Sequence, residues 1–228
     1  MGETMTVLLI ETATTTCGVG IMIDGVTEGV VVDRNRNHTE FLTGGIDEIL
    51  TKHGLTPRDL TRVVVDRGPG LYTGLRVGIA TATGLANGLG IDLVGVTSLQ
   101  MLARGALEAG VRGDMVALID GRRGEVFAQH FILGETAVAL DEPIVATPLE
   151  IVERMTGLES VSLWGDGVSR YREHFQTLVN ATLVPLEIPP LEAGLRLGAE
   201  APPELVVTPL YLRDPDAVAN FTTREQRS

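Results

Sequence analysis

The sequence predicts an α/β protein of two related lobes, each with a mixed sheet. Two observations indicate this class. A strand–turn–strand unit opens the chain and recurs in its middle, as "LIETATTTCGVGI" around Glu11 and "LIDGRRGEVFA" around Asp120. Alternating helix and strand patterns follow each unit. We place an N-terminal lobe at residues 1–105 and a smaller C-terminal lobe with a tail at 106–228. The pattern alone leaves open whether the units are a duplication or a chance recurrence.

Each element of the first lobe has a local signal. Strands are expected at 6–11, 17–24 and 28–34, with Asp24–Gly25 as a hairpin turn. Apolar residues at helical spacing predict a helix over 38–54 that stops at Gly54. Strands at 62–66 and 92–96 flank a glycine-rich segment, and Ser98 could cap a helix over 98–110.

The second lobe repeats this order. A strand, a turn and a second strand are expected within 114–133, followed by a helix at 147–155. A strand at 160–165 and a single helix at 167–179 come next. The sequence does not show how the proline-rich tail from Pro185 to Pro209 is arranged.

The glycine-rich segment from Arg67 to Gly90 is best interpreted as a packing helix. It lacks the lysine of a P-loop and the spacing of a dinucleotide fingerprint. From Thr73 to Leu89 it reads as a helix whose small residues share one face; that stripe comprises Gly70, Gly74, Gly78, Ala82, Ala86 and Gly90. Each interior glycine costs about 1 kcal/mol of helix propensity, so close packing must compensate. The residues alone favour the chain's own sheet as the neighbour, with a partner protein as the alternative.

Composition excludes several classes. The net charge is −12, with one lysine, so autonomous nucleic-acid binding is not expected. A single cysteine excludes an internal disulfide, and the start of the chain does not read as a signal peptide. The single cysteine fits a reducing compartment, so we expect a cytoplasmic protein, and with no apolar run of about 18 residues we expect no membrane contact. The histidines at 38, 53, 130 and 174 show no ligand spacing, so we expect neither a metal nor a cofactor.

Several segments in the expected order resemble the TsaB (YeaZ) family. They are "LLIETATTTCGVGI", "HTEFL", "GPGLYTGLRVGIATATGLANGLGIDLVGVTSLQMLA", "ALIDGRRGEVFAQ" and "PLYLRDPDA". The resemblance implies a two-lobed actin/hexokinase-like ATPase (ribonuclease H-like) fold. It also implies a non-catalytic role in making threonylcarbamoyladenosine on tRNA. In that family TsaB binds the transferase TsaD, and often itself, TsaE joins the complex, and tRNA is met only through the complex.

The resemblance also implies where partners bind. The interface would include the helix that begins at His38 and the glycine helix. Its candidate residues are His38, Glu40, Phe41, Leu42, Tyr72, Thr73, Gly74, Arg76, Val77 and Gly78. Arg76 could either anchor this interface beside Tyr72 or cap a sheet edge.

Glu11, Asp120 and Arg122 form a candidate vestigial nucleotide site. Active ATPases of the superfamily carry a carboxylate after the first strand of each lobe, and Glu11 and Asp120 stand in those places. Arginine can pair with phosphate, although "GRRGE" lacks a glycine-only cradle. The competing interpretation is that both acids accept hydrogen bonds from turn amides. The alternative function is therefore an independent ATPase or small-molecule kinase.

Overall fold

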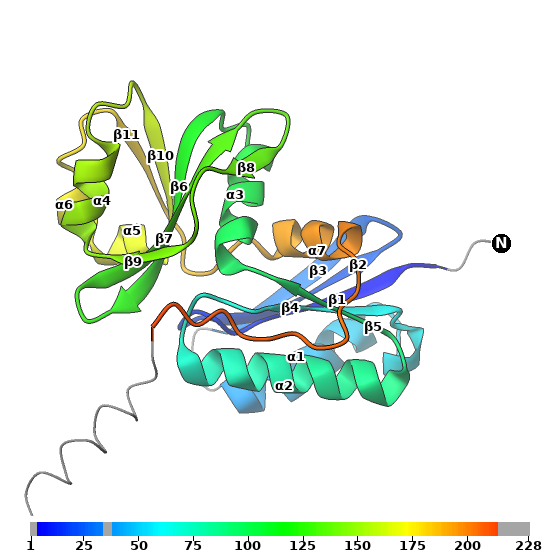
Figure 1. Ribbon diagram of the computed structural model, residues 1–228. Helices are drawn as coiled ribbons and strands as arrows, with labels where there is room; N and C mark the ends of the chain where they lie inside the picture. Colours follow the sequence, from blue (N-terminus) through cyan, green and yellow to red (C-terminus); the bar gives the residue numbers. More distant parts are fainter. Residues whose placement is uncertain (1–3, 34–37, 214–228) are drawn as a thin grey trace, which may run out of the picture.

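Two sheets divide the chain into two lobes in the computed structural model, which describes residues 4–33 and 38–213 (Figure 1). The first sheet has the order β3-β2-β1-β4-β5. Its strands are β1 (Thr6–Glu11), β2 (Cys17–Ile23), β3 (Val26–Asp33), β4 (Arg62–Asp66) and β5 (Asp92–Val96). β1 pairs antiparallel with β2 and parallel with β4, so the sheet is mixed as predicted.

The second sheet repeats the hairpin and adds parallel strands. Its order is β11-β10-β6-β7-β8, and β9 also pairs with β7. Its strands are β6 (Gly113–Arg122), β7 (Glu125–Leu133), β8 (Ala137–Ala139), β9 (Ile144–Ala146), β10 (Val161–Gly165) and β11 (Ala181–Pro185). β6 pairs antiparallel with β7 and parallel with β10, as β1 does with β2 and β4.

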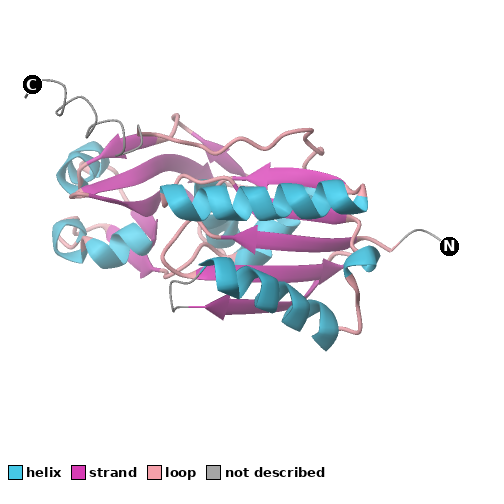
Figure 2. Ribbon diagram, turned by 90° about the horizontal axis from the view of Figure 1, so that it is seen from below, coloured by secondary structure: helices cyan, strands magenta, loops and turns pink. Residues whose placement is uncertain are grey.

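Helices cover both faces of the first sheet. α1 (His38–Lys52) and α2 (Tyr72–Leu89) lie side by side under it, and α7 (Leu191–Glu200) lies on the opposite face (Figures 1 and 2). α3 (Ser98–Glu108) follows β5 and packs on β6 of the second lobe. The second lobe also holds α4 (Pro148–Met155), α5 (Asp166–Arg170) and α6 (Arg172–Phe175). In the first lobe, the short helix η1 (Pro57–Asp59) precedes β4.

The alternation of β1 explains why all six of its residues are buried. Leu8 and Ile10 belong to the apolar cluster under α1 and α2. Val7 and Leu9 point to the other face, into the cluster formed with α7. Successive side chains of a strand face opposite ways, so a strand covered on both sides has no exposed position.

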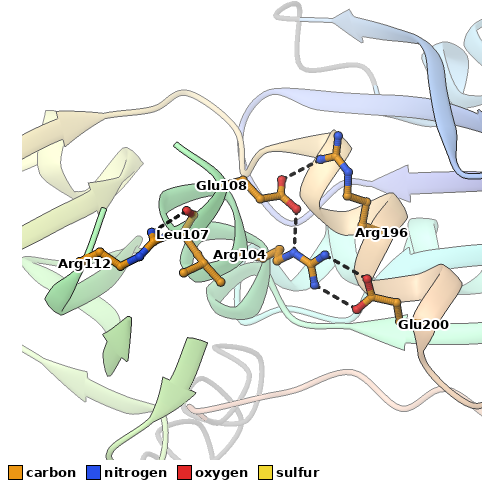
Figure 3. Close-up of polar contacts among 6 residues, drawn as sticks. All are labelled: Arg104, Leu107, Glu108, Arg112, Arg196 and Glu200. Carbon is orange, nitrogen blue, oxygen red and sulfur yellow. Dashed lines mark hydrogen bonds and ion pairs between the residues drawn. The ribbon is translucent and has the colours of Figure 1, made fainter. Parts of the chain in front are cut away.

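Ion pairs hold α3 and α7 together (Figure 3). The Arg104 guanidinium donates to both carboxylate oxygens of Glu200, at 3.0 and 2.9 Å, and to Glu108 at 2.7 Å. Arg196 donates to the other oxygen of Glu108 at 2.7 Å. Isolated surface pairs contribute about 0–1 kcal/mol, and a shared network of this kind adds geometric order.

The chain ends its described part in a strap, residues 201–213, that returns along the first lobe (Figure 1). The amide of Glu204 donates to the carbonyl of Leu93, and the amide of Leu210 donates to that of Arg67. At its end, Arg213 donates to Glu125 at 2.6 Å and to the carbonyl of Gly121 at 2.8 Å in the second lobe. The strap therefore contacts both lobes.

Two expectations need correction, and the structure also shows how the proline-rich tail is arranged. The helix expected over 167–179 is two short helices, because Tyr171 between them leaves helical geometry at φ −120° and ψ 30°. The proline-rich tail contains α7, which starts directly after Pro190 and returns to the first lobe, where Gly194 and Gly198 approach Leu9 and Val64. Ser98 is not the cap of α3, since Thr97 accepts the hydrogen bond from the Gln100 amide.

Candidate functional site

The inner face of α2 packs on the loop that follows β1. A Cβ atom added to Gly70 would lie 2.2 Å from the Ala13 carbonyl oxygen, and one added to Gly74 would lie 2.0 Å from that of Thr12. At Gly78 it would lie 2.2 Å from the Thr12 hydroxyl oxygen. These contacts are too close for any side chain, so only glycine fits. The neighbour of this part of the stripe is the chain's own loop, which the residues alone favoured, and contact of Gly74 and Gly78 with a partner stays a prediction.

The outer face of α2 is exposed and carries a second series of small residues. Ala80, Gly84 and Gly88 follow one another at four-residue intervals and are all exposed. A Cβ atom added to Gly84 or Gly88 would meet nothing within 4 Å. Thr73 and Arg76 extend the same exposed face toward the start of the helix, and Val77 beside them is half-buried.

Helix α1 lies beside α2, and the residues predicted there for the partner interface differ in their exposure. His38 and Glu40 fall in its first turn, and their side chains lie outside what the structure describes. Leu42 is only 2 % exposed and belongs to the core under the sheet, so most of its side chain packs within this chain. Phe41 is half-buried, with its ring against Gly45.

Tyr72 and Arg76 contact the strap. The two rings of Tyr72 and Tyr211 stack with centroids 4.9 Å apart, and the Arg76 guanidinium lies 4.0 Å from the Tyr72 centroid. Arg76 also donates a hydrogen bond of 3.1 Å to the Tyr211 hydroxyl. Arg76 does not cap a sheet edge, because its guanidinium contacts Tyr72 and Tyr211. Its guanidinium instead holds the strap against the exposed start of α2.

Glu11 and Asp120 lie at the ends of β1 and β6 and accept hydrogen bonds from turn amides. Glu11 Oε1 accepts from the amides of Ala13 at 2.7 Å and Thr14 at 3.3 Å. Asp120 Oδ1 accepts from the Arg122 amide at 2.9 Å, and the Arg122 guanidinium pairs with the same carboxylate at 3.0 Å. The structural interpretation of these acids is confirmed, whereas a nucleotide site remains a hypothesis.

The two acids differ in exposure. A cleft between the hairpins is lined by Thr15, Thr16, Asp120, Arg122, Asp166 and Ser169. Glu11 is absent from that lining because its side chain is fully buried. Burial raises the pKa of Asp166 to about 6, chiefly because the charged form loses its water.

Asp66 was missed from the sequence. It ends β4 and is completely buried. Its oxygens accept a hydrogen bond from the Gly68 amide at 2.7 Å and lie 2.9 and 2.7 Å from the Ser98 hydroxyl oxygen. The available signal was that "RVVVD" ends in an acid before a turn, as do the strands that end at Glu11 and Asp120.

The described residues were compared with two kinds of feature, a metal-ion site and a membrane-spanning helix. Across residues 4–33 and 38–213, no three histidine, cysteine, aspartate or glutamate side chains gather in a way that could hold a metal ion. No helix in the same ranges combines the length and apolarity needed to cross a membrane.

Known proteins resemble this chain over most of its length. A family model described as TsaD, tRNA N6-adenosine threonylcarbamoyltransferase, matches residues 29–183. The tRNA threonylcarbamoyladenosine biosynthesis protein TsaB of Escherichia coli is 34% identical over 156 residues, which cover 68% of each chain. An uncharacterized protein of Mycobacterium tuberculosis is 35% identical over 219 residues, 93% of each chain.

Solved structures agree on the fold. YeaZ from Pseudomonas aeruginosa superposes with a TM-score of 0.78 at 24% identity, covering 91% of this chain and all of that one. Component A of (R)-2-hydroxyglutaryl-CoA dehydratase from Acidaminococcus fermentans reaches 0.54 at 9% identity, covering 86% and 97%. The actin/hexokinase-like fold predicted for the two mixed sheets is thereby confirmed. With a model match over more than half of its length and curated relatives above 30% identity, the chain belongs to the TsaB (YeaZ) family, within the group that the TsaD model describes.

Proposed function

We propose that this protein is a non-catalytic subunit of the tRNA threonylcarbamoyladenosine-forming complex. It would bind the transferase TsaD and help to recruit TsaE. The names of the relatives support the pathway, and the match to the TsaD model supports a relation to the transferase itself. In proteins of common descent, an interface between two related subunits often reuses one surface, so a homodimer of the isolated chain is part of the proposal.

The proposed binding surface for the partner is the outer face of α2. Gly84 and Gly88 each cost about 1 kcal/mol of helix propensity relative to alanine. Inside the described part of the chain nothing within 4 Å of either position requires glycine. A partner backbone that approaches this face closely would account for both residues, as small residues do at other tight helix contacts.

The charge of the chain supports an indirect role toward tRNA. A net charge of −12 repels a polyanion, whereas tRNA binding draws on neutralised phosphates. The subunit would therefore leave tRNA contacts to its partners. The full burial of Glu11 works against the alternative of an independent ATPase or kinase, because a buried carboxylate is not available to a nucleotide. Metal-dependent ATP turnover that Asp120→Ala abolishes would favour that alternative.

The test is the molar mass of the chain, alone and with its cognate TsaD, by light scattering on a sizing column. We expect a 1:1 complex that replaces any homodimer and that then retains TsaE. Gly84→Leu should fold and fail to bind TsaD, since its side chain enters open space in the free chain. The matched control is Gly134→Leu, which also enters open space but lies in the second lobe.

Two outcomes would contradict the proposal. If wild-type chain and TsaD elute separately, with and without ATP and TsaE, the scaffold role is wrong. If the complex forms equally well with Gly84→Leu and Gly134→Leu, the scaffold role stands and the surface on α2 is wrong.

A further inference from the structure

Two buried carboxylates end the neighbouring strands β1 and β4 of the first sheet. β1 and β4 are parallel neighbours in which Ile10 is paired with Val65, so the next residues, Glu11 and Asp66, are adjacent. Both side chains have an exposed fraction of 0 %. Residues at equivalent positions of adjacent strands point to the same face of a sheet. The fold therefore holds two acids together without water.

The acceptor oxygens around Glu11 and Asp66 outnumber the hydrogen-bond donors that can reach them. Glu11 Oε2 is buried without a partner, although Oε1 accepts two amides. The Ser98 hydroxyl oxygen lies 2.7 and 2.9 Å from the oxygens of Asp66 and 3.0 Å from the Pro69 carbonyl oxygen. A hydroxyl has one proton to donate, so it cannot serve all three acceptors. Buried unsatisfied acceptors are rare in native proteins and call for an explanation.

The described neighbours of the pair supply no compensating positive charge. Asp166 on α5 adds a negative charge, and Cys17 on β2 adds a neutral thiol. Arg67, next to Asp66, directs its guanidinium to Glu204 at 2.8 Å, and Arg122 pairs with Asp120. Two like charges in a dry site with no cation are strongly unfavourable.

We propose that Glu11 and Asp66 hold one proton between them at neutral pH and that this proton secures the packing of α2 on the loop after β1. A protonated Asp66 can donate to the Ser98 hydroxyl, which then donates to the Pro69 carbonyl, and a neutral Glu11 removes the charge from an oxygen that has no donor. The pKa directions agree: burial first, and then Asp66, raise the pKa of Glu11 well above its usual range. Burial raises the pKa of Asp66 to about 7. Such a pair titrates as a unit, like two carboxylates that share a proton.

Glu11 and Asp66 lie where their charge can affect the packing of α2 on the loop after β1. Glu11 holds the amides of the loop on which Gly70 and Gly74 pack, and Asp66 holds the start of α3 through Ser98. Loss of the proton leaves two negative charges at the ends of β1 and β4, and their repulsion loosens the contact between the loop and α2. The inference does not depend on which partner the outer face of α2 binds.

The test is the unfolding equilibrium constant as a function of pH, for wild type and Glu11→Gln. A carboxyl whose pKa is raised on folding binds its proton in the native state and releases it on unfolding. Stability is then full below the unfolded pKa of about 4.3 and is lost as pH rises through the folded pKa. Between pH 5 and 7 the unfolding constant should rise up to tenfold more per pH unit in wild type than in Glu11→Gln. Exposed Glu142→Gln is the control, and it should keep the wild-type slope.

A second measurement keeps the proposal testable if Glu11→Gln does not fold. The infrared spectrum of the wild type should show a protonated carboxyl band at pH 7 that disappears as pH rises above 8. Absence of that band at pH 7, or equal pH slopes in wild type and Glu11→Gln, would overturn the proposal. So would a stabilisation by Mg²⁺ that Glu11→Gln removes, because the pair would then hold a cation in place of the proton.

Discussion

Gly74→Ala tests the packing of α2 most directly. Its new Cβ would lie 2.0 Å from the Thr12 carbonyl oxygen, far inside the about 3.5 Å at which non-bonded atoms normally meet. The obstacle is backbone, so it cannot rotate away, and either the loop or the helix must shift. Gly84→Ala on the same helix is the matched control, since its Cβ meets nothing within 4 Å.

The magnitude follows from two opposed effects. Alanine gains about 1 kcal/mol of helix propensity at either position. Overpacking costs about 1–3 kcal/mol, and we take the upper value because the clash is with backbone. Gly74→Ala should then lower the free energy of unfolding by about 2 kcal/mol, and Gly84→Ala should raise it by about 1. Gly78→Ala should fall between them, because it displaces the Thr12 hydroxyl, which can rotate but then loses its 2.8 Å bond to the Gly74 carbonyl.

Urea unfolding followed by far-ultraviolet circular dichroism measures all three variants. The slope with denaturant should stay constant, so that the midpoints report stability. If Gly74→Ala and Gly84→Ala change the free energy of unfolding equally, the inner face of α2 does not pack on the loop at Thr12. The proposed packing of α2 would then be wrong.

Three further predictions concern other parts of the fold. Thr147→Ala removes the N-cap that binds the Glu150 amide and should cost about 1 kcal/mol in urea unfolding. Glu204→Gln weakens the pair with Arg67 and should cost about 1 kcal/mol, with faster proteolysis of the strap; an unchanged cleavage rate would count against its role. Asp166→Asn removes a carboxyl whose pKa is raised to about 6, so the wild type should lose stability as pH rises from about 4 to 6 while the variant does so less.

Much of the fold could be predicted because its signals are local. The Asp24–Gly25 hairpin, the alternation of β1 and the period of α2 all depend on residues close in sequence. The break at Tyr171 could not be predicted, since its hydroxyl donates to Asp120, 51 residues away. α7 was missed for a related reason: Pro190 reads as a breaker, yet a proline just before a helix is well tolerated.

The site was harder to predict than the fold. A stripe of small residues indicates close packing, but the sequence does not say what approaches it. For Gly74 the neighbour is Thr12, which is 62 residues away and reaches it only because α2 packs on the face of the sheet where the loop after β1 lies. Asp66 could have been found by comparing strand ends. Its pairing with Glu11 depends on the register of two parallel strands, which no local pattern specifies.

The strap has a mechanical consequence for the molecule as a whole. Leu210 is bonded to the backbone of the first lobe, and three residues later Arg213 is bonded to the second. Widening the angle between the lobes would stretch this short span and weaken one of its two hydrogen-bonded anchors. Hinge closure in two-lobed proteins depends on connections that bend freely. Here the end of the described chain acts as a brace, and cutting it after residue 200 would release a movement that the intact protein resists.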